Sequence, residues 1–475
     1  MAEAIEADIC IIGAGSGGLS VAAGAAYLGA KAVLFEKSRM GGDCLNYGCV
    51  PSKALLAAAK LPAMTASATS FGVSFAAPKI DFPAVIAHVQ GVIARLAPFD
   101  SVARFEALGV RVIQASAKFT APDRIVGGGV TVRARRFVIA TGSRPLVPPV
   151  PGLERVPFLT NETLFENRLL PRHLVVLGGG PIGLEMAQAH RRLGAEVTVV
   201  EMQDRVVPKD DPELAELLAV RLRHEGITLR LGTTATAVSG NAGDIRIRVR
   251  QGDREEEIAA SHLLVAAGRK ANVEDLGLEA AGIAYSPKGI TVDRRLRTSN
   301  RKVFAIGDCA GGPQFTHVAG YHAGIVLRNA LFRLPAKANH DTIPWVTFTD
   351  PELAHVGLSE AAARERHGTI RILRWPYAEN DRAQAEGETH GLIKVVTAAS
   401  GRILGADILG AHAGELIQPW VLALSQRLKI GAMAGLVLPY PTLGEIGKRA
   451  ASAYFAPKLF DPKLRKLLRF LARFG

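Results

Sequence analysis

Two segments of the sequence repeat one pattern: an apolar strand, a glycine-rich turn, a helix, a second strand and an acidic residue. In the first copy the turn is GAGSGG at residues 13–18 and the acid is Glu36. In the second copy the turn is GGGPIG at residues 178–183 and the acid is Glu201. The first glycine and the acid are 23 residues apart in both copies. Such a repeat predicts two dinucleotide-binding α/β domains of the Rossmann type, rather than two glycine-rich turns without a ligand.

Each part of the pattern has a role in binding a dinucleotide. Glycines let the backbone approach a pyrophosphate, the helix N-terminus supplies N–H groups and a positive dipole end, and the acid accepts ribose hydroxyls. A carboxylate at the end of the second unit repels a 2′-phosphate, so that site is expected to prefer NADH, while Arg205 keeps NADPH as the weaker alternative. The predicted binding residues are Gly13, Gly15, Gly18, Glu36, Gly178, Gly180, Gly183 and Glu201.

Each unit also closes with a similar strand. Residues 138–145 read VIATGSRP, and residues 263–271 read LLVAAGRKA. The proline-rich run 144–157 between them is expected to be a domain crossing, because successive prolines stiffen the chain and forbid helix. The residues expected near a nucleotide in these closing strands are Thr141, Gly142 and Gly268.

A pair of cysteines lies in the segment GGDCLNYGCVPSK. Cys44 and Cys49 would point about 140° apart on a regular helix, so a bond between them requires irregular backbone, which Gly48 permits. Pro51 suits the first turn of a helix, and a helix N-terminus stabilises a thiolate. The segment therefore predicts a redox-active disulfide, with a zinc half-site or two buried thiols as the alternatives.

Two charged residues are expected to assist this pair. Lys53 lies four residues beyond Cys49 on the same helical face, where its ammonium would stabilise a thiolate, and Glu185 is the candidate partner that holds it. The first nucleotide site is expected to hold FAD, because the redox cysteines lie in the same domain and must touch its ring. Zinc usually needs a shorter cysteine spacing and two more ligands, so no metal site is predicted.

The charge pattern argues against several other classes. The net charge is +13, but the basic residues are dispersed, so nucleic-acid binding is not expected. Acidic residues precede the first apolar stretch, which does not fit a secretory signal, and a cytoplasmic protein is expected. Residues 458–475 resemble a basic amphipathic helix, for which packing against the protein's own body is favoured over contact with a membrane surface or anionic partner.

With these motifs in order, the chain from about residue 5 to 455 resembles the class I pyridine nucleotide–disulfide oxidoreductases. That family includes dihydrolipoamide dehydrogenases, glutathione reductases and mercuric ion reductases. The resemblance implies an α/β fold with two Rossmann-like domains, for FAD and NAD, and a C-terminal α+β dimerisation domain. The implied segments are an FAD domain (1–148), an NAD(P) domain (149–272), an FAD-domain return (273–344), a dimerisation domain (345–457) and the tail (458–475).

The resemblance also assigns roles. It makes Cys49 the flavin-proximal charge-transfer thiol, Cys44 the interchange thiol and Asp308 a ligand of the ribityl chain of FAD. It implies a homodimer with shared active sites. The dimerisation domain is expected to begin near Trp345 with a mostly antiparallel sheet, whose hairpin is readable in LIKVV and RILGADILG around Gly401.

One position departs from the disulfide-reducing members of this family. Those members carry a His oriented by a Glu where this chain has Tyr440 and Glu445. Imidazole shuttles a proton near pH 7, whereas a tyrosine of ordinary pKa mainly donates one. Mercuric ion reductases resemble this chain in carrying Tyr there, but they also have a C-terminal vicinal cysteine pair, and no cysteine follows Cys309. Plain packing at an interface is the alternative role of Tyr440.

The sequence therefore predicts an enzyme that passes electrons from NADH through FAD and the disulfide to an acceptor. The tyrosine favours a mercuric-reductase-like enzyme acting on a metal ion, a quinone or another electrophile. A dihydrolipoamide dehydrogenase is the enzymatic alternative. A redox-sensing or membrane-attached interaction protein is the alternative from another class.

Overall fold

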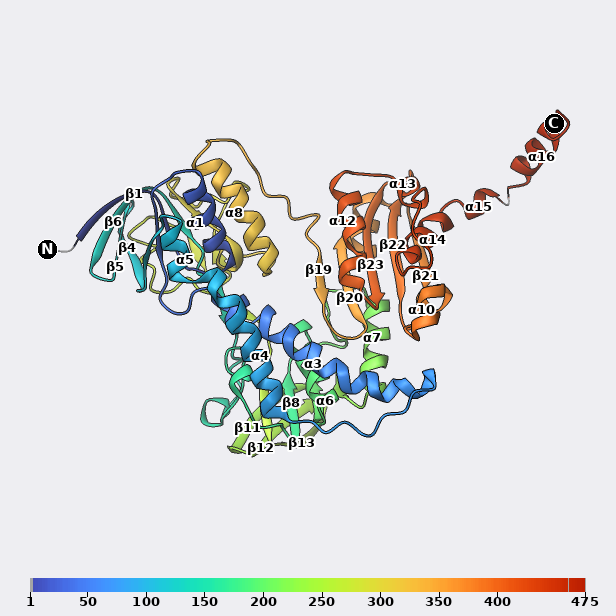
Figure 1. Ribbon diagram of the computed structural model, residues 1–475, viewed down its shortest axis with the longest axis horizontal. Coiled ribbons are helices and arrows are strands. Elements are labelled where there is room, and N and C mark those ends of the chain that lie inside the picture. Colours follow the sequence, from blue (N-terminus) through green and yellow to red (C-terminus); the bar gives the residue numbers. More distant parts are fainter. Residues whose placement is uncertain (1–2, 460, 475) are drawn as a thin grey trace. The chain divides into compact units, whose positions relative to one another are not determined.

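The computed structural model describes residues 3–459 and 461–474. The chain divides into two compact units, Met1–Met202 with Thr233–His340 and Gln203–Gly232 with Asp341–Gly475. Both units mix helices and strands, which confirms the expected mixed α/β fold (Figure 1). Each unit combines segments of more than one predicted domain, so the predicted domain boundaries stay predictions.

A largely parallel sheet forms around the first glycine pattern. Its strands follow the order β3-β2-β1-β6-β5-β4, with β18 pairing parallel to β6 and with β5 and β4 antiparallel. Helices α1 and α8 pack together over one face (Figure 1). The bounds are β1 Glu3–Ile12, α1 Ser16–Tyr27, β2 Ala32–Phe35, β3 Arg111–Ile113, β4 Ala117–Ala121, β5 Arg124–Gly127, β6 Val130–Ile139, β18 Val303–Ala305 and α8 Thr316–Ala330.

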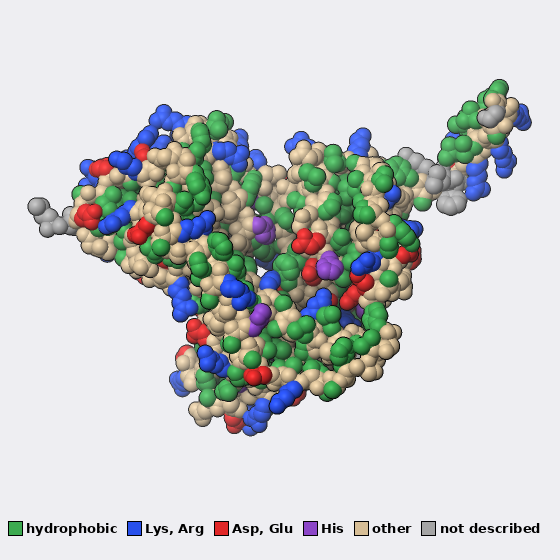
Figure 2. Space-filling model, in the orientation of Figure 1, with side chains coloured by type: hydrophobic (Ala, Val, Ile, Leu, Met, Phe, Trp, Pro, Cys, Tyr) green, Lys and Arg blue, Asp and Glu red, His purple; other side chains and the backbone are tan. Residues whose placement is uncertain are grey.

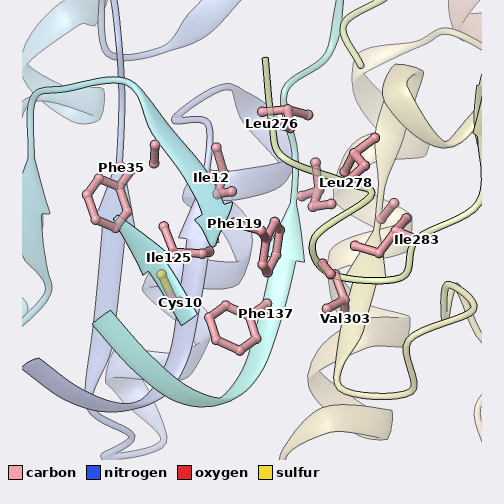
Figure 3. Close-up of a cluster of buried hydrophobic side chains, with 14 of the residues drawn as sticks. Cys10, Ile12, Phe35, Phe119, Ile125, Phe137, Leu276, Leu278, Ile283 and Val303 are labelled. Carbon is pink, nitrogen blue, oxygen red and sulfur yellow. The ribbon is translucent and has the colours of Figure 1, made fainter. Parts of the chain in front are cut away.

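The opposite face of this sheet is covered by segments from distant parts of the sequence. Figure 3 shows Cys10 and Ile12 of β1 in one buried cluster with Phe119, Leu278 and Ile283. Because strands buried on both faces lack a polar side, β1 reads as a continuous apolar run beyond Asp8. The shared cluster places the segment around residues 276–290 in the same core as the first glycine unit.

The second glycine pattern forms a further parallel set of strands in the same unit. Strand β8 pairs with β9 on one side and with β14 on the other, and α6 follows the turn. Beside them β11, β12 and β13 form an antiparallel sheet. The bounds are β8 His173–Leu177, α6 Pro181–Arg192, β9 Glu196–Val200, β11 Thr234–Asn241, β12 Asp244–Gln251, β13 Arg254–Ala260 and β14 His262–Val265.

Helices between the two glycine patterns carry the cysteine segment. Helix α3 contacts both α4 and α6, so it packs against the helix that follows the second glycine turn. One segment, Phe82–Ala107, has the length and composition of a helix that can cross a bilayer, and 17% of its apolar 18-residue window is buried. The bounds are α2 Gly42–Asn46, α3 Cys49–Ser67, α4 Phe82–Leu96 and α5 Val102–Ala107.

The second unit is built on an antiparallel sheet of strand order β19-β20-β23-β22-β21. The predicted hairpin is confirmed, because β22 and β23 pair antiparallel and Gly401 between them has φ +83°. The strand bounds are β19 Trp345–Thr347, β20 Glu352–Gly357, β21 Ile370–Pro376, β22 Leu392–Ala398 and β23 Ile403–Gly410. The main helices are α7 Pro212–His224, α9 Glu360–His367, α10 Asp381–Glu386, α12 Gln418–Ser425, α13 Ile430–Ala434 and α14 Glu445–Ala453.

The tail departs from the expectation that it packs against the body. It contains α16, Pro462–Leu471, a helix as predicted, but none of the residues of α16 is buried. Leu467, Leu468 and Leu471 are each at least half exposed. The amphipathic pattern was therefore interpreted correctly as a helix, but the favoured packing on the protein's own body was wrong for the described residues.

Candidate active site

The first glycine turn has the shape that a bound pyrophosphate requires. Gly13 has φ +104°, and a Cβ there would overlap the carbonyl of Ala140. A Cβ on Gly18 would overlap the carbonyl of Gly13, so this glycine permits close packing of α1 on the strand. Beside Gly15, by contrast, the nearest atom to a Cβ would be 3.9 Å away. The turn is thus tight at both ends and open in the middle, where the pyrophosphate of a dinucleotide is expected.

The predicted acid of this unit closes the turn. Glu36 is buried, and its two carboxylate oxygens accept hydrogen bonds of 2.7 Å from the backbone N–H groups of Ala14 and Ser38. Gly15 precedes α1 and has no side chain to cap the helix, so the first N–H groups of α1 have no side-chain acceptor from that position. These residues fit a dinucleotide such as FAD.

The second turn repeats this geometry. Gly178 has φ +118° beside the carbonyl of Ala266, and a Cβ on Gly183 would overlap the carbonyl of Gly178. A Cβ on Gly180 would meet no atom within 4 Å. Glu201 accepts a 2.6 Å hydrogen bond from the N–H of Gly179. The second turn therefore fits a second dinucleotide for the same physical reasons.

The two cysteines lie where the backbone changes direction. Cys44 is in the short helix α2, and Cys49 is the first residue of α3, as Pro51 in the first turn predicts. Between them Gly48 has φ −120° and ψ −112°, which breaks the helix. Both are free thiols, and their side chains hydrogen-bond to each other. The predicted contact between them is present, and the disulfide that they would form on oxidation stays a prediction.

The surroundings make the two thiols chemically different. The hydrogen bond from Cys44, with help from the Thr316 hydroxyl and the Lys53 ammonium and against the effect of burial, lowers the pKa of Cys49 to about 6. The same hydrogen bond and burial raise the pKa of Cys44 strongly. Thr316, the first residue of α8, lies 3.4 Å from Cys49 Sγ. Near pH 7 the pair therefore holds a thiolate on Cys49 and a proton on Cys44.

The expected ion pair beside the cysteines is present. Lys53 Nζ donates to Glu185 Oε2 at 2.8 Å. Lys53 is partly exposed at 37%, while Glu185 is buried at 5%, so the acid on α6 fixes a cation on α3. This pair joins the helix of the cysteines to the helix of the second glycine turn. It places a positive charge where it stabilises the Cys49 thiolate.

The remaining predicted cofactor residues are Asp308, Thr141, Gly142 and Gly268. Burial raises the pKa of the Asp308 carboxyl, and it accepts a 2.5 Å hydrogen bond from Ser143. Arg269, which follows the predicted Gly268, donates to Ser143 and pairs with Asp43 at 3.2 Å. The predicted Thr141 donates to the carbonyl of Asn272 at 2.7 Å, and the predicted Gly142 accepts from the N–H of the same residue at 3.0 Å.

Tyr440 has a partner that the sequence did not predict. Its hydroxyl donates to Asp381 Oδ2 at 2.7 Å, and this hydrogen bond raises the pKa of the tyrosine. Its side chain is 69% exposed, which argues against packing inside its own unit. Glu445 begins α14 nearby and raises that pKa further. The tyrosine therefore keeps its proton near pH 7.

Sequence reasoning missed four polar residues of these sites. Ser143 and Arg269 stand in motifs that were recognised, ATGSRP and AAGRKA, so their position beside the glycines was a usable signal. Thr316 and Asp381 carry no motif, and only the folded chain brings them to Cys49 and Tyr440. Among the described residues, no group of three or more His, Cys, Asp or Glu side chains forms a metal site.

Comparison with known families gives two matches that together cover most of the chain. A family described as pyridine nucleotide-disulphide oxidoreductase matches residues 7–323. The dimerisation domain of the same family matches residues 343–451.

Two curated relatives of similar length carry different names. A mercuric reductase of Streptomyces lividans is 36% identical over 456 residues, which are 94% of this chain and 96% of that protein. A dihydrolipoyl dehydrogenase of Thermus scotoductus is 36% identical over 458 residues, which are 94% of this chain and 97% of that protein. Identity alone does not separate the two activities.

Solved structures agree over nearly the whole chain. The Cu(II) complex of the HOCl-induced flavoprotein disulfide reductase RclA from Escherichia coli has a TM-score of 0.84 and 27% identity, covering 93% of this chain and 99% of its own. LpdA from Mycobacterium tuberculosis has a TM-score of 0.85 and 28% identity, covering 94% of this chain and 99% of its own.

Proposed function

The chain belongs to the pyridine nucleotide-disulphide oxidoreductase family, and from this premise we propose that it reduces a metal ion, a quinone or another electrophile with electrons from NADH. As a family member it is an FAD-dependent oxidoreductase that uses a pyridine nucleotide. Its dimerisation domain supports a homodimer. The proposal concerns the acceptor, the choice of nucleotide and the roles of individual residues.

The open glycine turns indicate which residues hold the cofactors. The turn at 13–18 with Glu36 and Asp308 would hold FAD, and the turn at 178–183 with Glu201 would hold NADH. When bound, these groups would supply a hydride from the nicotinamide, a flavin that accepts it, and two electrons for the cysteine pair.

The cysteine pair would carry those electrons to the acceptor. Two electrons and one proton split a Cys44–Cys49 disulfide into one thiol and one thiolate. The thiolate settles on Cys49, whose pKa is lowered to about 6, and Lys53 compensates its charge. Cys44 keeps the proton and is the thiol that meets the acceptor. When the acceptor takes two electrons, the S–S bond forms again and the remaining proton leaves.

The hydrogen bond between Tyr440 and Asp381 is the observation that carries the choice of acceptor. Thiol–disulfide exchange with lipoamide needs a base that takes and returns a proton near pH 7. A tyrosine whose pKa is raised by a carboxylate does not take that proton. An acceptor that is bound directly by thiolates needs no such base. Relatives named mercuric reductase and a neighbour solved with Cu(II) support this class of acceptor.

We expect Tyr440→His to create lipoamide activity. The imidazole would supply the missing base, and Glu445 stands at the expected position to orient it. General base catalysis is worth about 100-fold or more, so turnover of dihydrolipoamide with NAD⁺ should rise at least about tenfold. Steady-state assays of that reaction, beside NADH oxidation with Cu²⁺, Hg²⁺ and a quinone, measure the change.

Tyr440→Phe is the matched control, because it removes the hydroxyl and supplies no base. It should leave lipoamide turnover at its low starting value. If the unmodified enzyme already turns over dihydrolipoamide faster than it oxidises NADH with any metal ion or quinone, the chain is a dihydrolipoamide dehydrogenase and the proposed acceptor is wrong.

The preference for NADH would depend on the charge of Glu201. Glu201→Gln keeps an acceptor for the Gly179 N–H and removes the negative charge that repels a 2′-phosphate. We expect kcat/KM for NADPH to rise about tenfold relative to that for NADH. Arg205→Gln is the comparison, because Arg205 binds the carbonyl of Pro208 and is expected to contribute little. If the unmodified enzyme prefers NADPH, the proposed preference for NADH is wrong.

Membrane attachment through the tail is a second candidate property, favoured by the exposed leucines of α16. A basic amphipathic helix binds anionic bilayers through its apolar face and its charges. The intact protein is expected to pellet with vesicles of phosphatidylserine and phosphatidylcholine. Deletion of residues 458–475 should abolish this while leaving NADH oxidation unchanged. Pelleting of the truncated protein to the same extent would contradict the role of the tail.

A further inference from the structure

Arginines line a cavity in the first unit that has no part in the redox site. The cavity has a volume of about 260 Å³. Five of its lining residues are arginines: Arg136, Arg295, Arg297, Arg301 and Arg333. Figure 2 shows Lys and Arg side chains along the upper margin of this unit, where Figure 1 places α8 and the segment after it.

The charges around this cavity are not balanced. Arg297 pairs with Asp293, with Nη2 to Oδ2 at 2.6 Å. Within the described parts of the chain, the other four arginines form no ion pair. Arg136 is half-buried, and burial together with the nearby Arg333 lowers the pKa of its guanidinium. Like charges held together in this way repel each other unless an anion lies between them.

The arginines are nevertheless held in place by the backbone. Asp293 Oδ1 accepts hydrogen bonds from the N–H groups of Arg295 at 2.8 Å and Arg297 at 3.0 Å. Between them Leu296 is buried with φ +63°, a left-handed conformation that a branched residue adopts only when its surroundings impose it. Asn329 of α8 donates to the carbonyl of Arg295 at 3.3 Å. These contacts therefore fix the backbone of the turn from which Arg295 and Arg297 line the cavity.

The cavity is separate from the cysteine pair. Thr316 at the start of α8 touches Cys49, while Asn329 near the end of the same helix lines the cavity. A helix rises 1.5 Å per residue, so these two positions are about 20 Å apart. Arg136 pairs in register with Ile9 of β1, four residues before the first glycine of the turn at 13–18.

We propose that this cavity binds a small oligophosphate, either a free chain of phosphates or the phosphate tail of a nucleotide. Guanidinium groups match phosphate oxygens with paired hydrogen bonds, and several of them accommodate a multiply charged chain better than a single carboxylate. The cavity is smaller than the roughly 300 Å³ at the lower end of drug-sized sites, which suits a compact anion. Phe304 also lines the cavity, and its buried apolar ring brings no competing charge.

The test uses the FAD-loaded enzyme saturated with NAD⁺, so that both dinucleotide sites are filled. Isothermal titration at about 0.15 M salt with inorganic tripolyphosphate and, separately, with ATP should show one site per subunit. The variant Arg295→Gln with Arg301→Gln should weaken binding by about tenfold or more, because two charge-assisted partners are lost. NADH oxidation should not change, since neither arginine belongs to the redox site.

The matched control is Arg250→Gln with Arg366→Gln, which removes the same net charge from two exposed arginines elsewhere. It should bind tripolyphosphate as the original protein does. Equal binding of both ligands identifies the phosphate chain as the recognised part, and tighter binding of ATP adds the nucleoside to it. Absence of saturable binding, or equal weakening in the two double variants, would overturn the proposal.

Discussion

Cys49→Ser is expected to lower NADH-driven reduction of the acceptor by about a thousandfold or more. The variant is expected to keep the fold, because serine has nearly the same shape as cysteine. It removes the thiolate that the Cys44 hydrogen bond, Thr316 and Lys53 stabilise, and a hydroxyl with an ordinary pKa does not replace it. Losses of this size are typical when the reacting group of an enzyme is deleted. Steady-state NADH oxidation with Cu²⁺ or a quinone measures the effect.

Counting thiols after denaturation shows whether the disulfide is the cause. The chain has four cysteines, so the oxidised enzyme should show two thiols and the NADH-reduced enzyme four. The Cys49→Ser variant should show three in both states. Cys10→Ala, which removes a buried thiol of β1, is the control. It should keep the activity, and its thiol count should still rise by two when NADH reduces the enzyme. Four thiols in the oxidised enzyme would contradict a redox-active pair.

The parts of the site that follow from local pattern were predictable from the sequence. Positive φ at Gly13 and the carbonyl contact of Gly18 are consequences of a short strand–turn–helix, whose glycine spacing is visible in the sequence. The place of Cys49 at a helix start follows equally from Pro51 two residues later. Both depend on residues only a few positions apart.

The parts that depend on tertiary packing were not predictable. Thr316 reaches Cys49 across 267 positions of sequence, and Asp381 reaches Tyr440 across 59. Neither threonine nor aspartate is rare enough to mark such a contact by itself. Lys53 and Glu185, 132 positions apart, were paired correctly only because both stand in recognised motifs on adjoining helices. The predicted packing of the tail was wrong because an amphipathic pattern specifies a helix but not which surface covers its apolar face.

A buried cation in the second unit was also invisible in the sequence. Lys394 is a buried residue of β22, a strand whose other side chains are apolar apart from Thr397, and its side chain is 5% exposed. Its Nζ lies 2.7 Å from Asp211, 2.9 Å from Glu360 and 3.2 Å from Glu213. Asp211 also accepts from the first N–H groups of α7. Lys394 therefore joins α7 and α9 to the sheet through three carboxylates.

Lys394→Met is expected to lower the free energy of unfolding by about 3–5 kcal/mol, because it leaves the buried Asp211 carboxylate without its cation. The partly exposed Glu213 and Glu360 keep their ion pairs with Arg374 and Arg364. Hydrogen bonds from Lys394 and Arg364 lower the pKa of Glu360 to about 2, so the part that Lys394 contributes is complete above the ordinary value of 4.5 and is lost as pH falls. Despite burial, the carboxylates raise the pKa of Lys394 above 10.5, so its contribution is complete below that pH and is lost as pH rises. The difference in the free energy of unfolding between the two proteins, measured with urea, should thus be largest between pH 4.5 and 10.5 and shrink outside that range.

Lys429→Met, at an exposed site in the same unit, is the control and should change the free energy of unfolding by less than about 0.5 kcal/mol. A similarly small effect of Lys394→Met would show that the network is not needed for stability.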